Sequence, residues 1–155
     1  MGSRFPVGTI APHSAEIVPT DFLECNGASL LRADYADLFS VVGTAWGSAD
    51  GTHFNLPDLR GRFLRGWDHA VARDPDRASR SACNTGGATG DNVGTVQSHQ
   101  FYSHTHGITL RTSTYRYSSS GSNRSQFNSA GSSTSSGGNE TRPINAGAMF
   151  IIRYQ

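Results

Sequence analysis

The chain has 155 residues, the length of one ordinary domain, and carries a formal net charge of +1. A net charge this small excludes the strong field that would draw a protein to nucleic acid or to an anionic membrane. Apolar residues make up only 35% of the sequence, against roughly 45–50% in typical globular domains, so one copy is expected to have a small core that association would supplement.

Two further classes of segment are missing from the sequence. No stretch approaches the ~20 consecutive apolar residues of a membrane-spanning helix, so no membrane insertion is expected. No apolar leader follows Met1, and synthesis in a cytoplasm is expected.

The first half of the chain carries the clearest signals for secondary structure. The run VGTIAP favours a strand. Asn26-Gly27 lies between apolar stretches around Leu23 and Leu30, and Asn-Gly is the strongest two-residue signal for a β-hairpin because both positions accept a positive φ. The sequence therefore predicts a hairpin here.

The stretch RADYADLFSVVG predicts a short helix. Tyr35, Leu38, Phe39 and Val42 stand at positions i, i+3, i+4 and i+7, which places them on one helical face. Gly43 is positioned to end the helix.

Glycines recur between residues 43 and 68 and predict turns. Large apolar residues are interspersed among them, and we expect these to form a core beneath a looped surface. The predicted core residues are Phe54, Leu56, Leu59, Phe63, Leu64 and Trp67.

The second half is polar until its end. Residues 69–97 alternate charges and then become rich in Gly, Asn and Thr, which predicts an exposed excursion with little core. Partial alternation from Ile108 predicts a strand, and residues 118–139 predict long loops or irregular strands held by partner chains. The apolar run 149–152 predicts a final buried strand.

The two cysteines, Cys25 and Cys83, lack CxxC spacing. Two free thiols are the favoured interpretation, with one disulfide as the alternative.

Four stretches together resemble one family. These are VGTIAP, FLECNGASLLRADYADLFSVVGTAWG, FNLPDLRGRFLRGWD and RPINAGAMFIIRY, and the family is the phage tail-collar domain. The resemblance covers residues 5–68 with 141–154 and combines two specific elements, NLPDLRGRF and the pattern GxxLxRxxYxxLF. Residues 69–97 and 98–140 lie outside it.

The resemblance implies a fold and a setting. The fold is mainly β with one short α-helix, a collar-type domain followed by an extended, intertwined β-rich tip over 98–140 in a homotrimer. The setting is the tail fibre of a virion or phage-like bacteriocin, made in the host bacterial cytoplasm. The implied partners are an upstream fibre shaft, a fibre-assembly chaperone, and a host surface glycan such as lipopolysaccharide or an outer-membrane protein.

The stretch SHQFYSHTHGI holds a His-x-His pair, His104 and His106. Residues i and i+2 of a strand point to the same face about 7 Å apart, so one strand can aim both imidazoles at one point. His99 falls at odd spacing and would face away, in a supporting role or simply exposed. The alternative for the pair is polar surface, the role also expected of His13, His53 and His69.

A threefold axis would turn two imidazoles per chain into six. The resemblance implies such an axial metal in some fibre tips, and here one transition-metal ion per trimer is expected. Octahedral nitrogen ligation suits Fe(II) or Ni(II) better than structural Zn, so Fe, Zn and Ni stay open.

Receptor binding is expected in the stretch TYRYSSSGSNRSQFNS. Aromatic and arginine side chains offer contact area, and asparagine and glutamine offer adaptable hydrogen bonds. The alternative is that the two tyrosines pack inside the trimer. The candidate residues are Tyr115, Arg116, Tyr117, Asn123, Arg124, Gln126, Phe127 and Asn128.

An enzyme is not expected. The sequence contains no HExxH, nucleophile elbow or phosphate loop. Several aspartates near the centre offer paired carboxylates for glycan hydrolysis, but turns and arginine pairs are the favoured interpretation. They are Asp58, Asp68, Asp74 and Asp76. A structural trimerisation module, with recognition elsewhere, remains the alternative to an adhesion protein.

Overall fold

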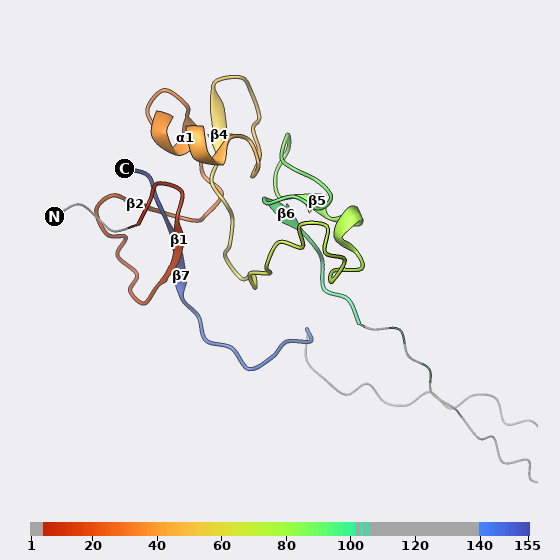
Figure 1. Ribbon diagram of the computed structural model, residues 1–155. Coiled ribbons are helices and arrows are strands. Elements are labelled where there is room, and N and C mark those ends of the chain that lie inside the picture. The colour runs from red at the N-terminus through yellow and green to blue at the C-terminus, as the bar shows by residue number, and fades with distance from the viewer. Residues whose placement is uncertain (1–4, 102, 104, 106–139) are drawn as a thin grey trace, which may run out of the picture. The chain divides into compact units, whose positions relative to one another are not determined.

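The computed structural model describes residues 5–101, 103, 105 and 140–155 (Figure 1). The predicted strand from Ile108 lies outside these residues.

The chain divides into two compact units. One comprises residues 1–98 with 145–155, and the other comprises residues 99–144. All the helices and strands that the structure describes belong to the first unit. In chain order they are β1 (Ile10–His13), β2 (Phe22–Glu24), β3 (Ser29–Leu31), α1 (Ala36–Val42), β4 (His53–Asn55), the 3-10 helix η1 (Arg77–Ser79), β5 (Ser81–Ala82), β6 (Thr95–Val96) and β7 (Met149–Arg153).

The last strand forms the centre of the main sheet. β7 pairs antiparallel with β1 on one edge and with β2 on the other, so the blue strand in Figure 1 lies with the red N-terminal ones. Ile152 stands opposite both Ile10 and Leu23. Ile151 and Ile152 are buried, which is the environment expected for a central apolar strand. The predicted final buried strand is confirmed.

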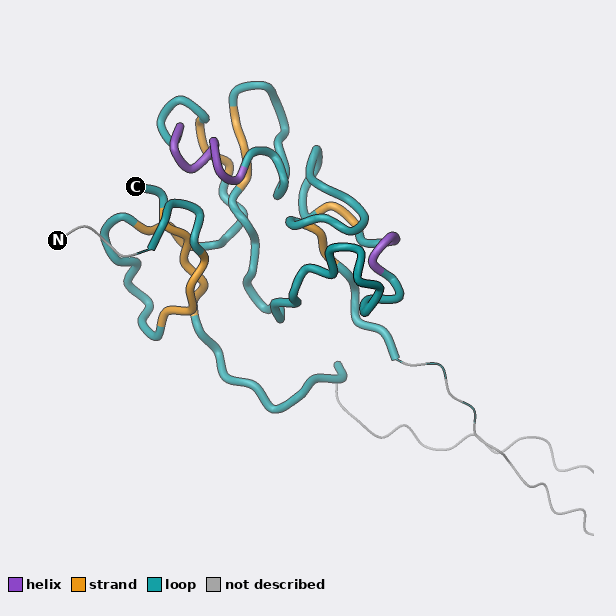
Figure 2. The backbone as a smooth tube through the Cα atoms, in the orientation of Figure 1, coloured by secondary structure: helices purple, strands orange, loops and turns teal. Residues whose placement is uncertain are grey.

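A second, two-stranded ribbon joins the helix to the core. β3 and β4 pair antiparallel, and α1 follows β3 along the chain (Figure 2). Gly43 ends the helix with a φ of 57° and donates its N–H to the Phe39 carbonyl. The predicted helix and its end are therefore confirmed.

The core joins these elements. Its buried side chains come from β4, α1, β7 and the turns beside them. Phe39 packs on Phe54 with ring centroids 5.3 Å apart, and Tyr35 meets Tyr154 edge to face at 5.4 Å. The core residues are Cys25, Leu38, Phe54, Leu56, Leu59 and Ile152. The fold class predicted from the sequence, mainly β with one short helix, is confirmed.

The predicted hairpin at Asn26-Gly27 is wrong. The strand containing Leu23 pairs with β7, whereas the strand containing Leu30 pairs with β4. Gly27 does adopt a positive φ of 79°, but its N–H bonds the Pro57 carbonyl rather than closing a two-residue loop. A local hairpin would leave one edge of buried β7 without a partner, so long-range pairing prevails.

Half of the predicted central core is also wrong. Phe54, Leu56 and Leu59 are buried, but Phe63, Leu64 and Trp67 are between 50% and 63% exposed. After Arg60 the chain turns at Gly61, with φ 65°, and leaves the core. Three large apolar side chains therefore face solvent in this single copy.

The cysteines are both free, so the favoured interpretation is confirmed. Cys25 is buried in the core, whereas Cys83 is partly exposed. Burial, followed by the nearby Glu24 carboxylate, raises the pKa of the Cys25 thiol to about 12.

Residues 69–97 contain η1, β5 and β6 and attach to the loop that follows α1. Ser48 donates its N–H to the Thr85 carbonyl, and Ala88 donates to the Ala45 carbonyl. Gly86 allows the close approach, because a Cβ there would lie 2.5 Å from the Ser48 oxygen. The segment is thus fixed mainly by backbone contacts.

Candidate functional site

The site residues predicted from the sequence lie outside the described part of the chain. This applies to the His-x-His pair and to all the receptor candidates. The pair is His104 and His106, and the receptor candidates are Tyr115, Arg116, Tyr117, Asn123, Arg124, Gln126, Phe127 and Asn128. These assignments stay predictions. Within the described residues, no group of three His, Cys, Asp or Glu side chains is placed to hold a metal ion.

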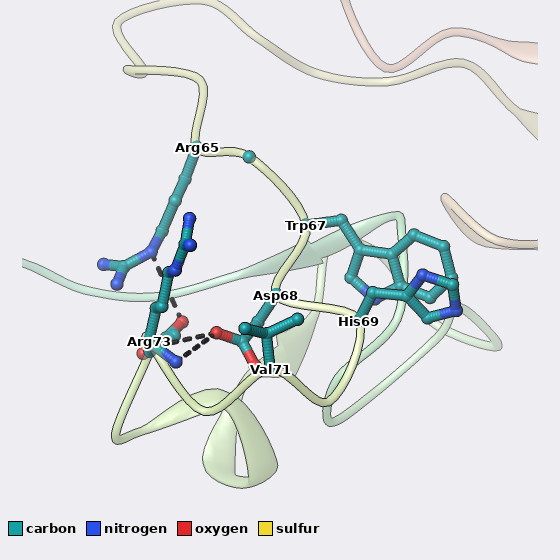
Figure 3. Close-up of a pocket in the computed structure, with 8 residues that line it drawn as sticks. Arg65, Trp67, Asp68, His69, Val71 and Arg73 are labelled. Carbon is teal, nitrogen blue, oxygen red and sulfur yellow. Dashed lines mark hydrogen bonds and ion pairs between the residues drawn. The ribbon is translucent and has the colours of Figure 1, made fainter.

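The structure adds a site that was not predicted from the sequence. After the exposed side chains of Phe63 and Leu64, the chain folds back on itself. Residues 65–74 line a pocket of about 300 Å³ that is open to solvent, which we call the Trp67 pocket (Figure 3). Its main lining residues are Arg65, Trp67, Asp68, His69, Val71 and Arg73.

An aromatic pair forms one flank of the Trp67 pocket. The rings of Trp67 and His69 stack with centroids 4.1 Å apart and an interplanar angle of 19°. The indole Nε1 donates to the Asp91 carbonyl at 3.1 Å, which fixes the ring. Trp67 nevertheless keeps 50% of its surface exposed, so the pair presents aromatic surface to solvent.

The backbone beneath this pair has an uncommon conformation. His69, Ala70 and Ala72 have φ values of 49°, 63° and 65°, a left-handed region that non-glycine residues rarely occupy. Such positions persist only where surrounding bonds hold them, and they cluster at functional sites.

The Asp68 carboxylate supplies most of those bonds. It accepts the backbone N–H groups of Ala72, Arg73 and Asp74 at 2.7 to 2.8 Å. Arg77 lies 3.6 Å away, and the Asp68 side chain is only 3% exposed. The N–H of Asp74, then those of Ala72 and Arg73, with the Arg77 charge, lower the pKa of Asp68 below its ordinary 3.8.

A second aspartate joins the pocket to the following strands. Asp74 is buried and lies 3.4 Å from Arg65 and 3.2 Å from Arg80. Arg80 also donates to the Thr95 hydroxyl at 2.8 Å and to Gln97 at 2.6 Å. The carboxylate therefore ties the loop to β5 and β6.

Asp91 completes the network from the other side. Its carboxylate accepts the Ala70 N–H at 2.7 Å and lies 3.9 Å from Arg77.

Asp58, outside the pocket, pairs with Arg60 at 2.8 Å. For Asp58, Asp68 and Asp74 the favoured interpretation, turns and arginine pairs, is confirmed. We refer to residues 65–97, held by these bonds, as the polar segment.

The arginine side chains of the pocket make fewer hydrogen bonds and ion pairs than its aspartates do. Arg65 meets Asp74 through Nε, and among the described residues its terminal amino groups have no hydrogen bond. The Arg73 guanidinium likewise has no ion pair within the described residues, although its backbone N–H is held by Asp68. The pocket therefore offers cationic donors beside an aromatic surface, while its carboxylates are occupied.

Only a weak pattern in the sequence indicates this pocket. GWDH reads as the end of a core motif, because nothing in it separates a buried tryptophan from an exposed one. The capture of three backbone N–H groups by Asp68 depends on a conformation that no local residue preference predicts. A run of Asp and Arg at short spacing was the one visible indication.

Comparison with known proteins identifies the class. The family model described as the phage tail collar domain matches residues 8–64, which are the residues that form β1 to β4, α1 and most of the core. The match confirms, for this part of the chain, the resemblance that the sequence motifs predicted.

Two relatives extend the similarity beyond the collar domain. The chain is 32% identical to protein RhiB of Rhizobium leguminosarum bv. viciae over 145 residues, covering 84% of this chain and 63% of that protein. It is 32% identical to the putative uncharacterized protein StfE of Escherichia coli K12 over 110 residues, covering 71% of this chain and 49% of that protein. The chain thus spans about three fifths and one half of these relatives.

Among the described residues, no helix is both long and apolar enough to span a bilayer.

Proposed function

We propose that this chain is the distal part of a tail fibre of a phage or phage-like particle, and that it attaches the particle to a host-cell surface without catalysis. The observation that carries the proposal is the collar domain over residues 8–64. The fibre shaft, an assembly chaperone and location in the virion belong to the same proposal.

The topology supports separate roles for the two units, a constant fold in the first and host recognition in the second. The chain leaves the collar unit after Ser98 and returns to it at Asn145, ending in β7 at the centre of the sheet. An insertion anchored at both ends can vary in sequence while the collar keeps its fold. Host recognition is therefore assigned to residues 98–140.

A homotrimer supports this function in two ways. Exposed Phe63 and Leu64 supply apolar surface that further copies would cover. Three linked tips also bind a surface more tightly than one, because the second and third contacts become intramolecular. Light scattering coupled to size-exclusion chromatography should give three chains per particle. A monomer at micromolar concentration would contradict the assembly.

The axial metal is part of the same proposal. His104 and His106 of three copies would hold one Fe, Zn or Ni ion, which stabilises only the assembled state. Elemental analysis should find about one ion per three chains, and His106→Ala should lose it. His99→Ala is the matched control and should keep it. Full metal content in His106→Ala would contradict the ligation.

Adhesion is tested with the intact trimer on host cells and on two isolated fractions, lipopolysaccharide and outer-membrane protein. Binding to one fraction should fall when Tyr115, Arg116 or Tyr117 is replaced by alanine, with the trimer unchanged. Arg142→Ala, outside the candidate stretch, serves as control. An intact trimer that binds no fraction would favour the structural trimerisation module, and loss of polysaccharide chain length would favour an enzyme.

A further inference from the structure

From the Trp67 pocket we infer a second binding site on this chain, which takes a sugar that carries an oxyanion, either a phosphate or a carboxylate. The site lies in the polar segment and is separate from residues 98–140. It rests on the proposed adhesion function for its purpose, adding a saccharide contact to the one assigned to the tip.

Size and openness suit a small polar ligand. The volume of about 300 Å³ lies at the lower end of small-ligand pockets, which span roughly 300–1,000 Å³. The pocket opens to solvent between a cationic flank and an aromatic flank, with Val71 between them in the view of Figure 3. A ligand with one charged group and one less polar face would match both flanks.

The cationic flank recognises the oxyanion. Arg73 has no ion pair among the described residues, and Arg65 engages Asp74 through Nε alone. Guanidinium groups bind carboxylate and phosphate through paired N–H donors. Asp68 is occupied by three backbone N–H groups. Asp74, which is also paired with Arg80, takes only the Nε of Arg65, so the terminal amino groups of Arg65 stay open to a ligand.

The aromatic flank offers a ligand only the outer face of a stacked pair. Trp67 and His69 already stack on each other at 4.1 Å, so no gap remains between them for an intercalated ring. Their outer surface is apolar and carries the negative face of the aromatic quadrupole, which suits the C–H groups of a pyranose. The sequence's net charge of +1 also gives no general attraction for nucleic acid.

The surrounding bonds hold the pocket in place before a ligand arrives. The backbone carbonyl of Asp91 accepts the indole N–H of Trp67, and its carboxylate accepts the backbone N–H of Ala70. Asp68 fixes the backbone on either side of Arg73. A preformed site loses less entropy on binding than a mobile one, which gives the left-handed backbone at His69, Ala70 and Ala72 a role in recognition.

The test is titration calorimetry on the full-length protein with glucose 6-phosphate and glucuronic acid as probes. At least one should bind saturably in the millimolar range, and the tighter one identifies the preferred oxyanion. Glucose and inorganic phosphate should each bind at least about fivefold more weakly, because each lacks one of the two recognised groups. Equal binding of glucose or of inorganic phosphate, tighter binding of adenosine monophosphate, or no binding of either probe would overturn the inference.

Variants locate the binding on the pocket. Arg73→Gln should weaken the probe about fivefold or more, whereas Arg62→Gln, an exposed arginine outside the lining, should leave it unchanged. Trp67→Leu should weaken it as well, with its melting temperature measured to confirm folding. Arg73 has no side-chain bond among the described residues to lose, so its variant gives a result even where Trp67→Leu does not fold. Unchanged affinity in Arg73→Gln would overturn the assignment.

These titrations use no cells and no tip variants. Failure of the pocket to bind a probe leaves the adhesion experiment unaffected, and a tip that fails to bind host fractions leaves the pocket result standing.

Discussion

The collar body (residues 5–64 with 145–155) and the polar segment (residues 65–97) are held together by different interactions. The collar body buries a small apolar core around Phe54 and Leu38. The polar segment has β-strands of two residues each and depends on aspartates that bind arginines and backbone N–H groups. A long loop with few apolar residues can therefore still be ordered, provided that each buried carboxylate has hydrogen-bond or ion-pair partners.

The largest expected effect lies in the collar body. Phe54→Ala removes a fully buried ring and should lower the free energy of unfolding by about 3–5 kcal/mol. Phe63→Ala, 63% exposed, should change it by less than about 0.5 kcal/mol in the isolated chain. Chemical denaturation of both variants checks this, and similar losses would mean that Phe63 belongs to the same core as Phe54.

The next effect belongs to the polar segment. Asp68→Ala removes the acceptor of three backbone N–H groups, and each unsatisfied donor costs about 1–3 kcal/mol. Amide exchange should accelerate at Ala72, Arg73 and Asp74 while the collar body stays protected. Asp76→Ala is the control, because within the described residues its carboxylate makes no hydrogen bond. Uniform acceleration across both regions would contradict local stabilisation.

Acid should loosen the polar segment while the collar body stays folded. The folded pKa of Asp68 is lowered from 3.8, so its contribution is complete above that ordinary value and is lost as the pH falls through the lower folded pKa. Below about pH 4 the polar segment should loosen, seen as a change in Trp67 fluorescence in a Trp46→Phe background, since the chain has two tryptophans. Asp68→Asn should abolish this transition. A Trp67 signal that is flat in the Trp46→Phe background with Asp68 in place, down to acid unfolding, would refute it.

The smallest expected effect is a difference in reactivity between the thiols of Cys25 and Cys83. Burial raises the pKa of Cys25 to about 12, so almost no thiolate exists at neutral pH and the side chain is enclosed. A disulfide reagent should label Cys83 quickly and Cys25 only after unfolding. Cys83→Ser should remove the fast phase entirely. A fast phase that persists in Cys83→Ser would show that the collar core opens readily.

What the sequence predicted follows the same division. The helical stripe ending at Gly43 and the apolar run of β7 are local patterns, and both are confirmed. The partners of the strands were not predictable, because the pairing of Leu23 with Ile152 joins positions far apart in the chain. The exposure of Trp67 was missed because it too depends on a distant residue. The hydrogen bond from its indole to the Asp91 carbonyl cannot be read from the local sequence.

The place of β7 has a consequence for biosynthesis. β1 and β2 are translated early, yet neither pairs with the other, and the strand that joins them is Met149–Arg153. The collar sheet therefore cannot close until residues 99–144 have left the ribosome. A chain that ends before Met149 lacks this central strand, so both β1 and β2 would be without their partner in the sheet.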